Sequence, residues 1–273
     1  MGFESWLLLV SSGVVTGMLA GLLGIGGGVI LVPLMISLGY APIKVVATSS
    51  LAIAITAFSG SIQNWRMGYL DMTRVLYLGV PALLTTQLGV RIASHIPPYT
   101  LLILFGVFLL ANIYLIDCRR RLAKEDTGSK TSINSLTSEL FVGAVAGLLT
   151  GVLGVGGGIV MITLQMLLLG RSIKAAIQTS LGVLAGVALS ACIMHATRGN
   201  LLLLPGLTLG LGSVFGVRLS ARFLPKLPET TVKLIFRVFL MVMSAYVFWQ
   251  AYQLFADTAI ALPLDFRPNQ VML

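Results

Sequence analysis

Two glycine clusters are the residues of this sequence whose types and spacing point most directly to binding chemistry. The first cluster contains Gly24, Gly26, Gly27 and Gly28, and the second, 130 residues later, contains Gly154, Gly156, Gly157 and Gly158. Each glycine in a helix interior costs roughly 1 kcal/mol relative to alanine, so both clusters are expected to interrupt helices. An interrupted helix leaves backbone N–H and C=O groups without intrahelical partners, and these groups become available to a ligand.

An anion is the ligand that fits such an interruption. Helices that restart at Val29 and Ile159 are expected to direct N–H groups and the positive end of the helix dipole toward the break. Glycine has no Cβ, so a ligand can approach the backbone closely. Acidic residues such as Asp71, Asp117 and Glu139 lie only near the ends of the apolar runs. A cation pathway through a membrane usually places a carboxylate inside it, so the inventory favours a negatively charged ligand.

Hydroxyl groups recur at equivalent positions of the two halves and could extend the site. They belong to Ser49, Ser50, Thr179 and Ser180, again 130 residues apart. They could donate hydrogen bonds to an oxyanion, but Ser and Thr in helices also bond to the backbone of their own helix. The residue types alone favour neither interpretation.

Four basic residues recur in register as well. Lys44 is repeated as Lys174, and Arg91 is repeated as Arg218 with an offset of 127. These residues could steer an anion toward a pore, or they could be side chains that extend to the membrane interface from helix ends. Both interpretations stay open.

Other kinds of chemistry find little support. The glycine clusters have no preceding strand and no following ribose-binding acid, as a dinucleotide site requires, and no cofactor is expected. Cys118 and Cys192 are isolated and give no metal-ligand spacing, so no metal is expected. No nucleophile–base pair is apparent, which argues against an enzyme. His95 and His195 could carry protons, so protons are a candidate coupling ion.

Composition places the chain in the lipid bilayer. Hydrophobic residues make up 57% and charged residues only 10%, with a mean hydropathy of +0.98, whereas soluble domains carry about 25% charged residues. The net charge of +9 is not gathered into a basic patch with interleaved aromatic residues, so nucleic acid is not an expected partner. The sequence therefore predicts a multi-pass protein of the bacterial inner membrane.

The apolar segments form two similar halves. In repeat 1, residues 1–117, a hairpin over 5–38 is followed by helices over 43–64, 72–94 and 99–117. A cytoplasmic loop covers 118–137. In repeat 2, residues 138–256, a hairpin over 138–170 is followed by helices over 173–196, 200–223 and 230–256, and a tail covers 257–273. A membrane-spanning helix needs about 20 residues, so 5–38 and 138–170 are too long for one crossing.

Charge distinguishes two topologies. If each long segment crosses once, the 18 Lys and Arg residues divide nine to nine between the two sides. If each folds back at its glycines, 14 lie on one side and four on the other. The second division obeys the positive-inside rule and the first does not. We therefore expect an all-α membrane protein with two inverted repeats, each a glycine-broken re-entrant hairpin plus three transmembrane helices.

The paired motif resembles a known family. The runs Gly-Leu-Leu-Gly-Ile-Gly-Gly-Gly at 21–28, with Pro33 after it, and Gly-Val-Leu-Gly-Val-Gly-Gly-Gly at 151–158 are similar to the twin signature of the TauE/SafE sulfite exporters (TSUP). The resemblance covers essentially the whole chain. It implies transport of a small sulfur-containing anion such as sulfite, a sulfonate such as sulfoacetate, or thiosulfate. One departure is that Thr163 occupies the position equivalent to Pro33.

Together these features predict a transporter that exports such an anion by alternating access and holds it between the two glycine-rich hairpins. The alternatives are a passive anion channel and an importer of the same substrates.

Overall fold

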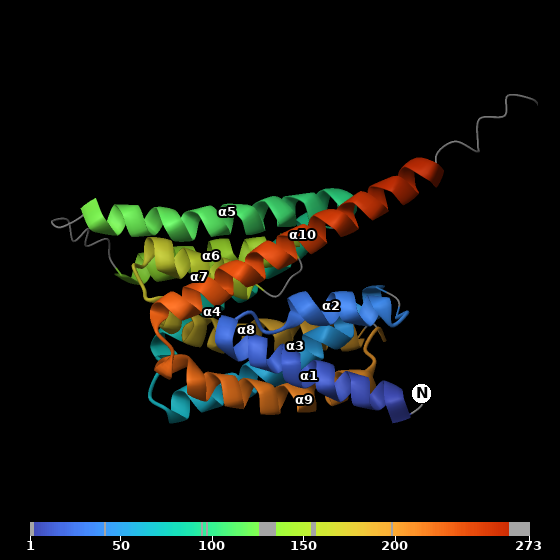
Figure 1. The fold of residues 1–273 in the computed structure, drawn as a ribbon, viewed down its shortest axis with the longest axis horizontal. Helices are drawn as coiled ribbons and strands as arrows, with labels where there is room; N and C mark the ends of the chain where they lie inside the picture. Colours follow the sequence, from blue (N-terminus) through green and yellow to red (C-terminus); the bar gives the residue numbers. More distant parts are fainter. Residues whose placement is uncertain are drawn as a thin grey trace, which may run out of the picture.

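The structure is a computed structural model of the 273-residue chain, and it describes residues 3–40, 42–93, 95–96, 98–125, 135–153, 157–197 and 199–261. These residues form helices and connecting turns and contain no strand (Figure 1). In chain order the helices are α1 (Phe3–Leu23), α2 (Gly28–Ser37), α3 (Pro42–Arg66), α4 (Met72–Ala93), α5 (Pro98–Glu125), α6 (Ser135–Leu153), α7 (Gly158–Leu168), α8 (Ile173–Thr197), α9 (Leu203–Phe223), the short 3-10 helix η1 (Leu224–Lys226) and α10 (Glu229–Ala261).

The expectation of an all-helical, multi-pass membrane protein is confirmed. Within the described residues, six helices are long and apolar enough to cross a membrane: α1, α3, α4, α8, α9 and α10. This set contains α1, which was expected to be only one arm of a hairpin, and it lacks α5. The residues Trp6–Leu23 of α1 contain no charged side chain. In α5 the stretch with described side chains is Thr100–Tyr114, and the apolar run of the sequence continues through Leu115 and Ile116.

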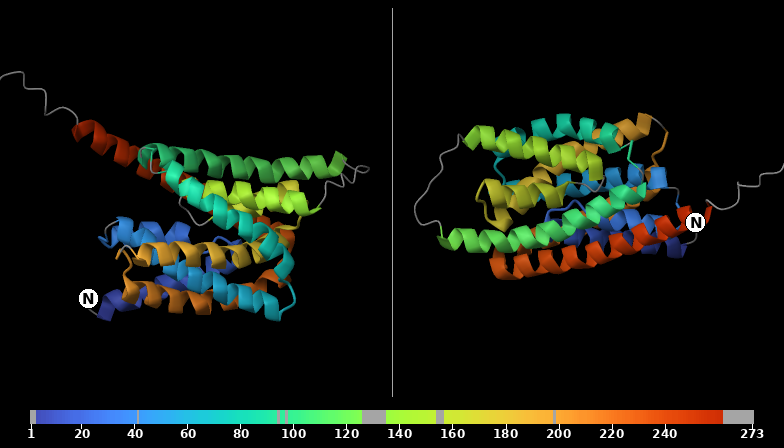
Figure 2. Two further views of the ribbon diagram at one scale, coloured as in Figure 1. Left: turned by 180° about the vertical axis from the view of Figure 1, so that it is seen from behind. Right: turned by 90° about the horizontal axis from the view of Figure 1, so that it is seen from above.

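Both long apolar segments are interrupted at their glycine clusters. The first consists of α1 and α2, separated by residues 24–27, and the second consists of α6 and α7, separated by residues 154–157. In Figures 1 and 2 the chain reverses its direction at each interruption: α1 runs toward one end of the molecule and α2 turns back, and α6 and α7 do the same from the other end.

Helix pairs with small residues hold the two halves together. Helix α1 packs along α9, and α6 packs along α4. In both pairs the contact is backbone to backbone: a Cβ on Gly17 would lie 2.6 Å from the Ser213 Cα, and a Cβ on Gly89 would lie 2.8 Å from the Gly151 Cα. Such small-residue stripes allow helices in membranes to approach closely. The pairs are related by the sequence repeat, because α6 and α4 are the counterparts of α1 and α9.

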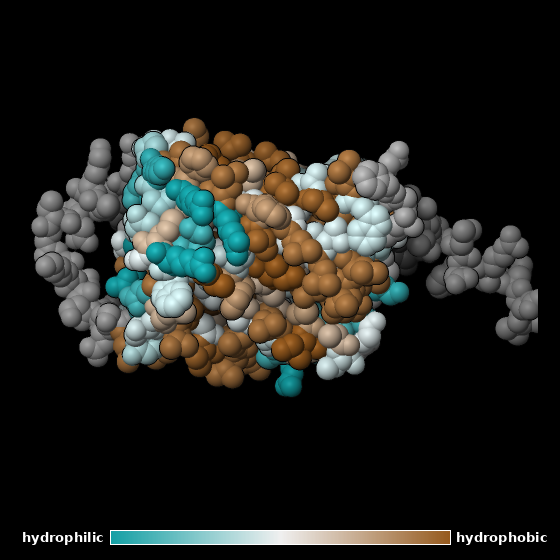
Figure 3. Space-filling model, turned by 90° about the horizontal axis from the view of Figure 1, so that it is seen from below, coloured by the Kyte–Doolittle hydropathy of each residue, from teal (hydrophilic) through white to brown (hydrophobic). Residues whose placement is uncertain are grey.

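The surface has the pattern of a membrane protein. Large apolar side chains such as Leu84, Phe141, Leu211 and Phe215 are between 61% and 75% exposed, and soluble proteins do not expose apolar surface on this scale. Figure 3 shows hydrophobic side chains over the middle of one face and hydrophilic side chains gathered at one end.

We call that end the basic end. It is where α3, α5, α7 and α9 finish and where α4, α6, α8 and α10 begin, at the left of Figure 1. The basic residues near these helix ends include Arg66, Arg74, Arg171, Lys174, Arg222 and Lys226. At the other end, the opposite end, lie the start of α3 and the finish of α4 (Figure 1), which carry Lys44 and Arg91.

Candidate functional site

The first glycine cluster breaks the helix with a left-handed backbone. Helix α1 ends at Leu23, and Gly24, Gly26 and Gly27 have φ angles of +66°, +68° and +81°. Side chains disfavour this region by about 1–2 kcal/mol per residue. Helix α2 then begins at Gly28, and the Gly27 carbonyl accepts the first helical hydrogen bonds, from Ile30 N at 3.1 Å and Leu31 N at 3.1 Å.

The second cluster has a similar helix start. Gly157 is the N-cap of α7 with a φ of +53°, and its carbonyl accepts a hydrogen bond from Met161 N at 2.9 Å. No side chain caps this N-terminus. Gly154 and Gly156 lie outside the described residues, so the break itself is described here only from Gly157 onward.

The two clusters are in direct contact. A Cβ on Gly158 would overlap the Gly24 carbonyl oxygen and lie 2.6 Å from the Ile25 Cα. Only glycine fits at Gly158, because the atoms that face it are backbone. Ile25 and Ile159, which flank this contact, belong to one fully buried apolar cluster. The break of one half therefore packs against the helix start of the other half.

The electrostatics of this contact favour negative charge. The N-terminus of α7 lies at it and α2 begins four residues after Gly24. The N–H groups in the first turn of a helix have no carbonyl within the helix to bond to. The first turns of α2 and α7, all of whose residues are described, contain no acidic side chain. Helix N-termini whose first turns carry no carboxylate are suited to bind an anion.

Of the four candidate hydroxyls, the structure brings Ser180 to the glycines. Its Oγ donates to the Gly24 carbonyl oxygen at 2.9 Å and also lies 2.9 Å from its own helix's Ile177 carbonyl. The other three donate to carbonyls of their own helices: Ser49 and Ser50 to Val46 at 3.0 and 2.8 Å, and Thr179 to Ala175 at 2.9 Å.

Of the four repeated basic residues, Lys44, Arg91 and Lys174 lie at helix ends and Arg218 lies in the last third of α9. Lys44 and Arg91 are exposed near the opposite end. Near the basic end, Lys174 Nζ donates to the Pro225 carbonyl at 2.9 Å. Arg218 Nε donates to Ser59 Oγ at 3.1 Å. Lys174 and Arg218 thus bond to other parts of the protein. The steering role of all four residues stays a prediction.

A small cavity adjoins the second break. Gly157, Met161, Thr150 and Ser180 are among its lining residues, together with small and aliphatic side chains of α4, α6 and α8. It has room for about one water molecule. This cavity is therefore smaller than a sulfur oxyanion.

Two threonines at the breaks were missed in the sequence. A Cβ on Gly157 would overlap the Thr150 hydroxyl, and a Cβ on Gly27 would overlap the Thr16 methyl group. Thr150 also donates to the Ala146 carbonyl at 2.5 Å. The two threonines are not repeat equivalents of each other, so the internal repeat gave no signal for them. Their position in the first arm of each broken segment was the only indication.

Comparison with known proteins agrees with this architecture. The family model described as "Sulfite exporter TauE/SafE" matches residues 9–247. The chain is 26% identical over 219 residues to "Probable membrane transporter protein YdhB" of Bacillus subtilis, which covers 80% of this chain and 89% of that protein. It is 23% identical over 268 residues to "Probable membrane transporter protein YunE" of the same organism, covering 90% and 98%.

A third relative comes from another organism. "Probable membrane transporter protein MJ0441" of Methanocaldococcus jannaschii is 28% identical over 200 residues, which cover 70% of this chain and 72% of that protein. No solved structure matches the chain. The relatives are named as transporters, and no catalytic family is indicated. Since the family model covers most of the chain, the protein is a membrane transporter that belongs to the sulfite exporter TauE/SafE family.

Proposed function

We propose that the protein exports a small sulfur-containing anion, such as sulfite, a sulfonate or thiosulfate, and binds it between the two glycine breaks. The observation that carries this proposal is the contact of Gly158 with Gly24 and Ile25, which brings the N-terminus of α7 to the first glycine break, four residues before α2 begins. The absence of acidic residues from both first turns gives the ligand its negative sign. The description of the matching family, a sulfite exporter, supports a ligand that contains sulfur.

Transport is by alternating access of the two halves around this contact. The cavity beside Gly157 holds about one water, so a sulfur oxyanion enters only after the breaks separate. The helix pairs α1·α9 and α4·α6 cross between the halves, and they are suited to move as units against α3 and α8. Each broken segment forms a re-entrant hairpin, and the halves are inverted repeats, so the basic end faces the cytoplasm.

Flux measurements test the proposed function. Purified protein in proteoliposomes should carry at least one of sulfite, sulfoacetate and thiosulfate at a rate that saturates with concentration, and it should support counterflow. An imposed pH gradient that accelerates this flux would identify protons as the coupling ion. Flux that rises linearly without counterflow would instead indicate a passive channel, and no flux of any of the three would refute the substrate class.

Reporter fusions test the hairpin topology. A reporter fused after Tyr40 should have the same sidedness as one fused at the N-terminus, because the chain turns back between α1 and α2 (Figure 1). A reporter fused after Tyr69, in the turn between α3 and α4, should have the reverse sidedness. Opposite sides for the first two fusions would show that the segment 5–38 crosses the membrane once and would remove the inverted repeat.

A further inference from the structure

Four charged side chains form a cluster at the basic end, away from the glycine breaks. Arg171 Nη2 lies 2.7 Å from Glu139 Oε1, and Arg74 Nε lies 2.8 Å from Asp71 Oδ2 and 3.9 Å from the same Glu139 oxygen. Asp71 and Arg74 come from the start of α4, Glu139 comes from α6, and Arg171 follows α7. The cluster therefore joins both halves of the chain.

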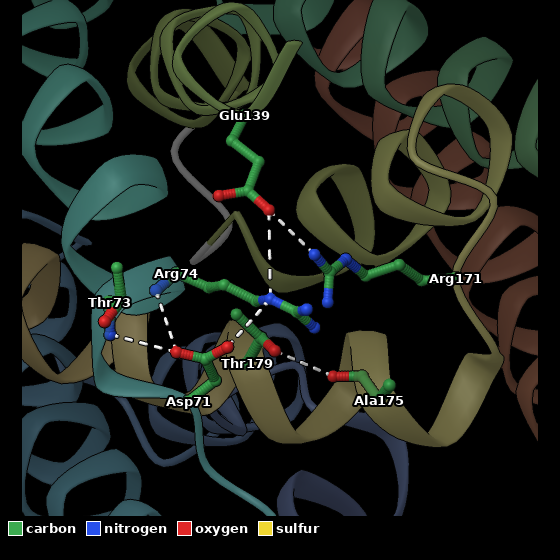
Figure 4. Close-up of polar contacts among 7 residues, drawn as sticks. All are labelled: Asp71, Thr73, Arg74, Glu139, Arg171, Ala175 and Thr179. Atoms are coloured by element: carbon green, nitrogen blue, oxygen red, sulfur yellow. Dashed lines mark hydrogen bonds and ion pairs between the residues drawn. The ribbon is translucent and has the colours of Figure 1, made fainter. Parts of the chain in front are cut away.

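Glu139 lies at the centre of this cluster and is deeply buried. Its side chain is 8% exposed, that of Arg171 is 14% exposed and that of Arg74 is 44% exposed. Figure 4 shows the Arg171 guanidinium directed at the Glu139 carboxylate and the Arg74 Nε between the carboxylates of Asp71 and Glu139, while Thr179 turns to the Ala175 carbonyl of its own helix. Two planar guanidinium groups beside one carboxylate are donors suited to an oxyanion. Glu139 supplies that oxyanion from the protein itself.

An unpartnered amide lies between this cluster and the glycine breaks. Gln165 is 0% exposed, and among the described residues neither its Oε1 nor its Nε2 has a hydrogen-bond partner. Its backbone carbonyl accepts a hydrogen bond from Arg171 N at 3.2 Å, so the backbones of the two residues are adjacent. Leaving a buried polar group unsatisfied costs about 1–3 kcal/mol, and such a group calls for a functional explanation.

The position of Gln165 on its helix supplies that explanation. Gly158, Met161 and Gln165 are spaced i, i+3 and i+7, so they share one face of α7. Gly158 contacts the first glycine break and Met161 lines the cavity. Gln165 lies about 10 Å further along the helix, next to Arg171. The face of α7 thus leads from the charged cluster to the site between the breaks.

The other half of the chain lacks this polar set. The repeat equivalents of Glu139 and Gln165 are Leu9 and Met35, which are buried together in one apolar cluster. Packing of the broken segment is thus satisfied by apolar residues in repeat 1. The polar residues Glu139 and Gln165 of repeat 2 therefore need a reason other than the fold.

We propose that Arg171, Arg74 and Gln165 form an access site for the transported oxyanion at the basic end, with Glu139 as a resident counter-ion. A small oxyanion takes the place of the Glu139 carboxylate between the two guanidinium groups and then passes to the Gln165 amide N–H groups. This inference rests on the proposed function, because it concerns the path to the glycine breaks. Sulfite and sulfonates present three oxygens, which can accept hydrogen bonds from several of these N–H groups.

Two substitutions that should change the KM for sulfite in opposite directions test the access site in oriented proteoliposomes. Glu139→Gln removes the competing carboxylate and should lower the KM for sulfite presented at the basic end by about threefold or more, whereas Arg171→Gln should raise it by a similar factor. Gln165→Met, which introduces the residue of repeat 1, should raise the KM with little change in the maximal rate. KM values for sulfite presented at the opposite end should change much less.

A purely structural ion-pair cluster would give a different result. Glu139→Gln and Arg171→Gln would then lower the maximal rate and the thermal stability together, with KM unchanged. The exchanged pair Glu139→Arg with Arg171→Glu would restore both. That pattern would overturn the access site.

A binding measurement separates this inference from the proposed function. Sulfite and sulfate should raise the thermal unfolding temperature of the detergent-solubilised Glu139→Gln variant more than that of the unmodified protein, and that of Arg171→Gln less. If the unmodified protein carries no sulfur anion, the proposed function fails, but this ordering of shifts would still support the anion site. If transport is normal and neither KM nor the shifts change among the variants, only the access site is wrong.

Discussion

Replacing Gly158 with alanine should abolish transport while the protein still inserts in the membrane. The added Cβ would overlap the Gly24 carbonyl oxygen and approach the Ile25 Cα at 2.6 Å. Both atoms are backbone, so they cannot rotate away, and overpacking of this kind costs about 1–3 kcal/mol. The cost falls on the contact between the two breaks that the proposed mechanism opens and closes. Sulfite flux and membrane content, measured on the same preparations, check this expectation.

The repeat supplies a matched control for this substitution. Gly28 is the equivalent of Gly158 and also begins a helix, but a Cβ there would meet the Ile53 Cδ1 at 2.6 Å. This atom is the end of a flexible side chain and can move. Gly28→Ala should therefore keep most of the transport rate. Equal losses in both variants would mean that the glycines serve only helix geometry and that the contact between the breaks has no special role.

The sequence was sufficient to locate the breaks but not to show what they touch. Successive glycines at 26–28 and 156–158 predict an interrupted helix from local propensity alone, and the helices end and restart there. The contact of Gly158 with Gly24 joins residues far apart in the chain. It depends on how α7 and α8 pack, and helical periodicity carries no information about that.

The hydroxyl pairs show the same limit at the level of one residue. Thr179 and Ser180 are neighbours in a repeated motif, and nothing in their types separates them. In the structure Ser180 reaches the Gly24 carbonyl and Thr179 bonds to its own helix. The rotation of α8 about its axis decides this, since adjacent helical residues point about 100° apart.

The charged residues were read from the sequence only as topological signals. Arg74 and Arg171 are two of the 14 Lys and Arg residues that the hairpin topology places on one side of the membrane, and Glu139 lies near the end of an apolar run. The structure gathers all three into one cluster. Their separation in sequence hides this, because α4, α6 and the α7–α8 turn meet only in the folded protein.

Replacing Gly27 with leucine should abolish transport, and replacing Gly39 with leucine should not. The two glycines have nearly the same backbone conformation, with φ angles of +81° and +84°, so the strain of a side chain in the left-handed region, about 1–2 kcal/mol, is similar in both variants. Their surroundings differ: a Cβ on Gly27 would overlap Thr16, and a Cβ on Gly39 has no atom within 4 Å. The difference in flux between the variants therefore reports the crowding at the first break and not the backbone strain.

The same comparison applies to the second half, where Gly157 at +53° faces Thr150 and Gly170 at +64° faces open space. Transport that survives in Gly27→Leu and Gly157→Leu would remove the breaks from the substrate path, whereas transport lost in all four variants would show that strain alone explains the effect.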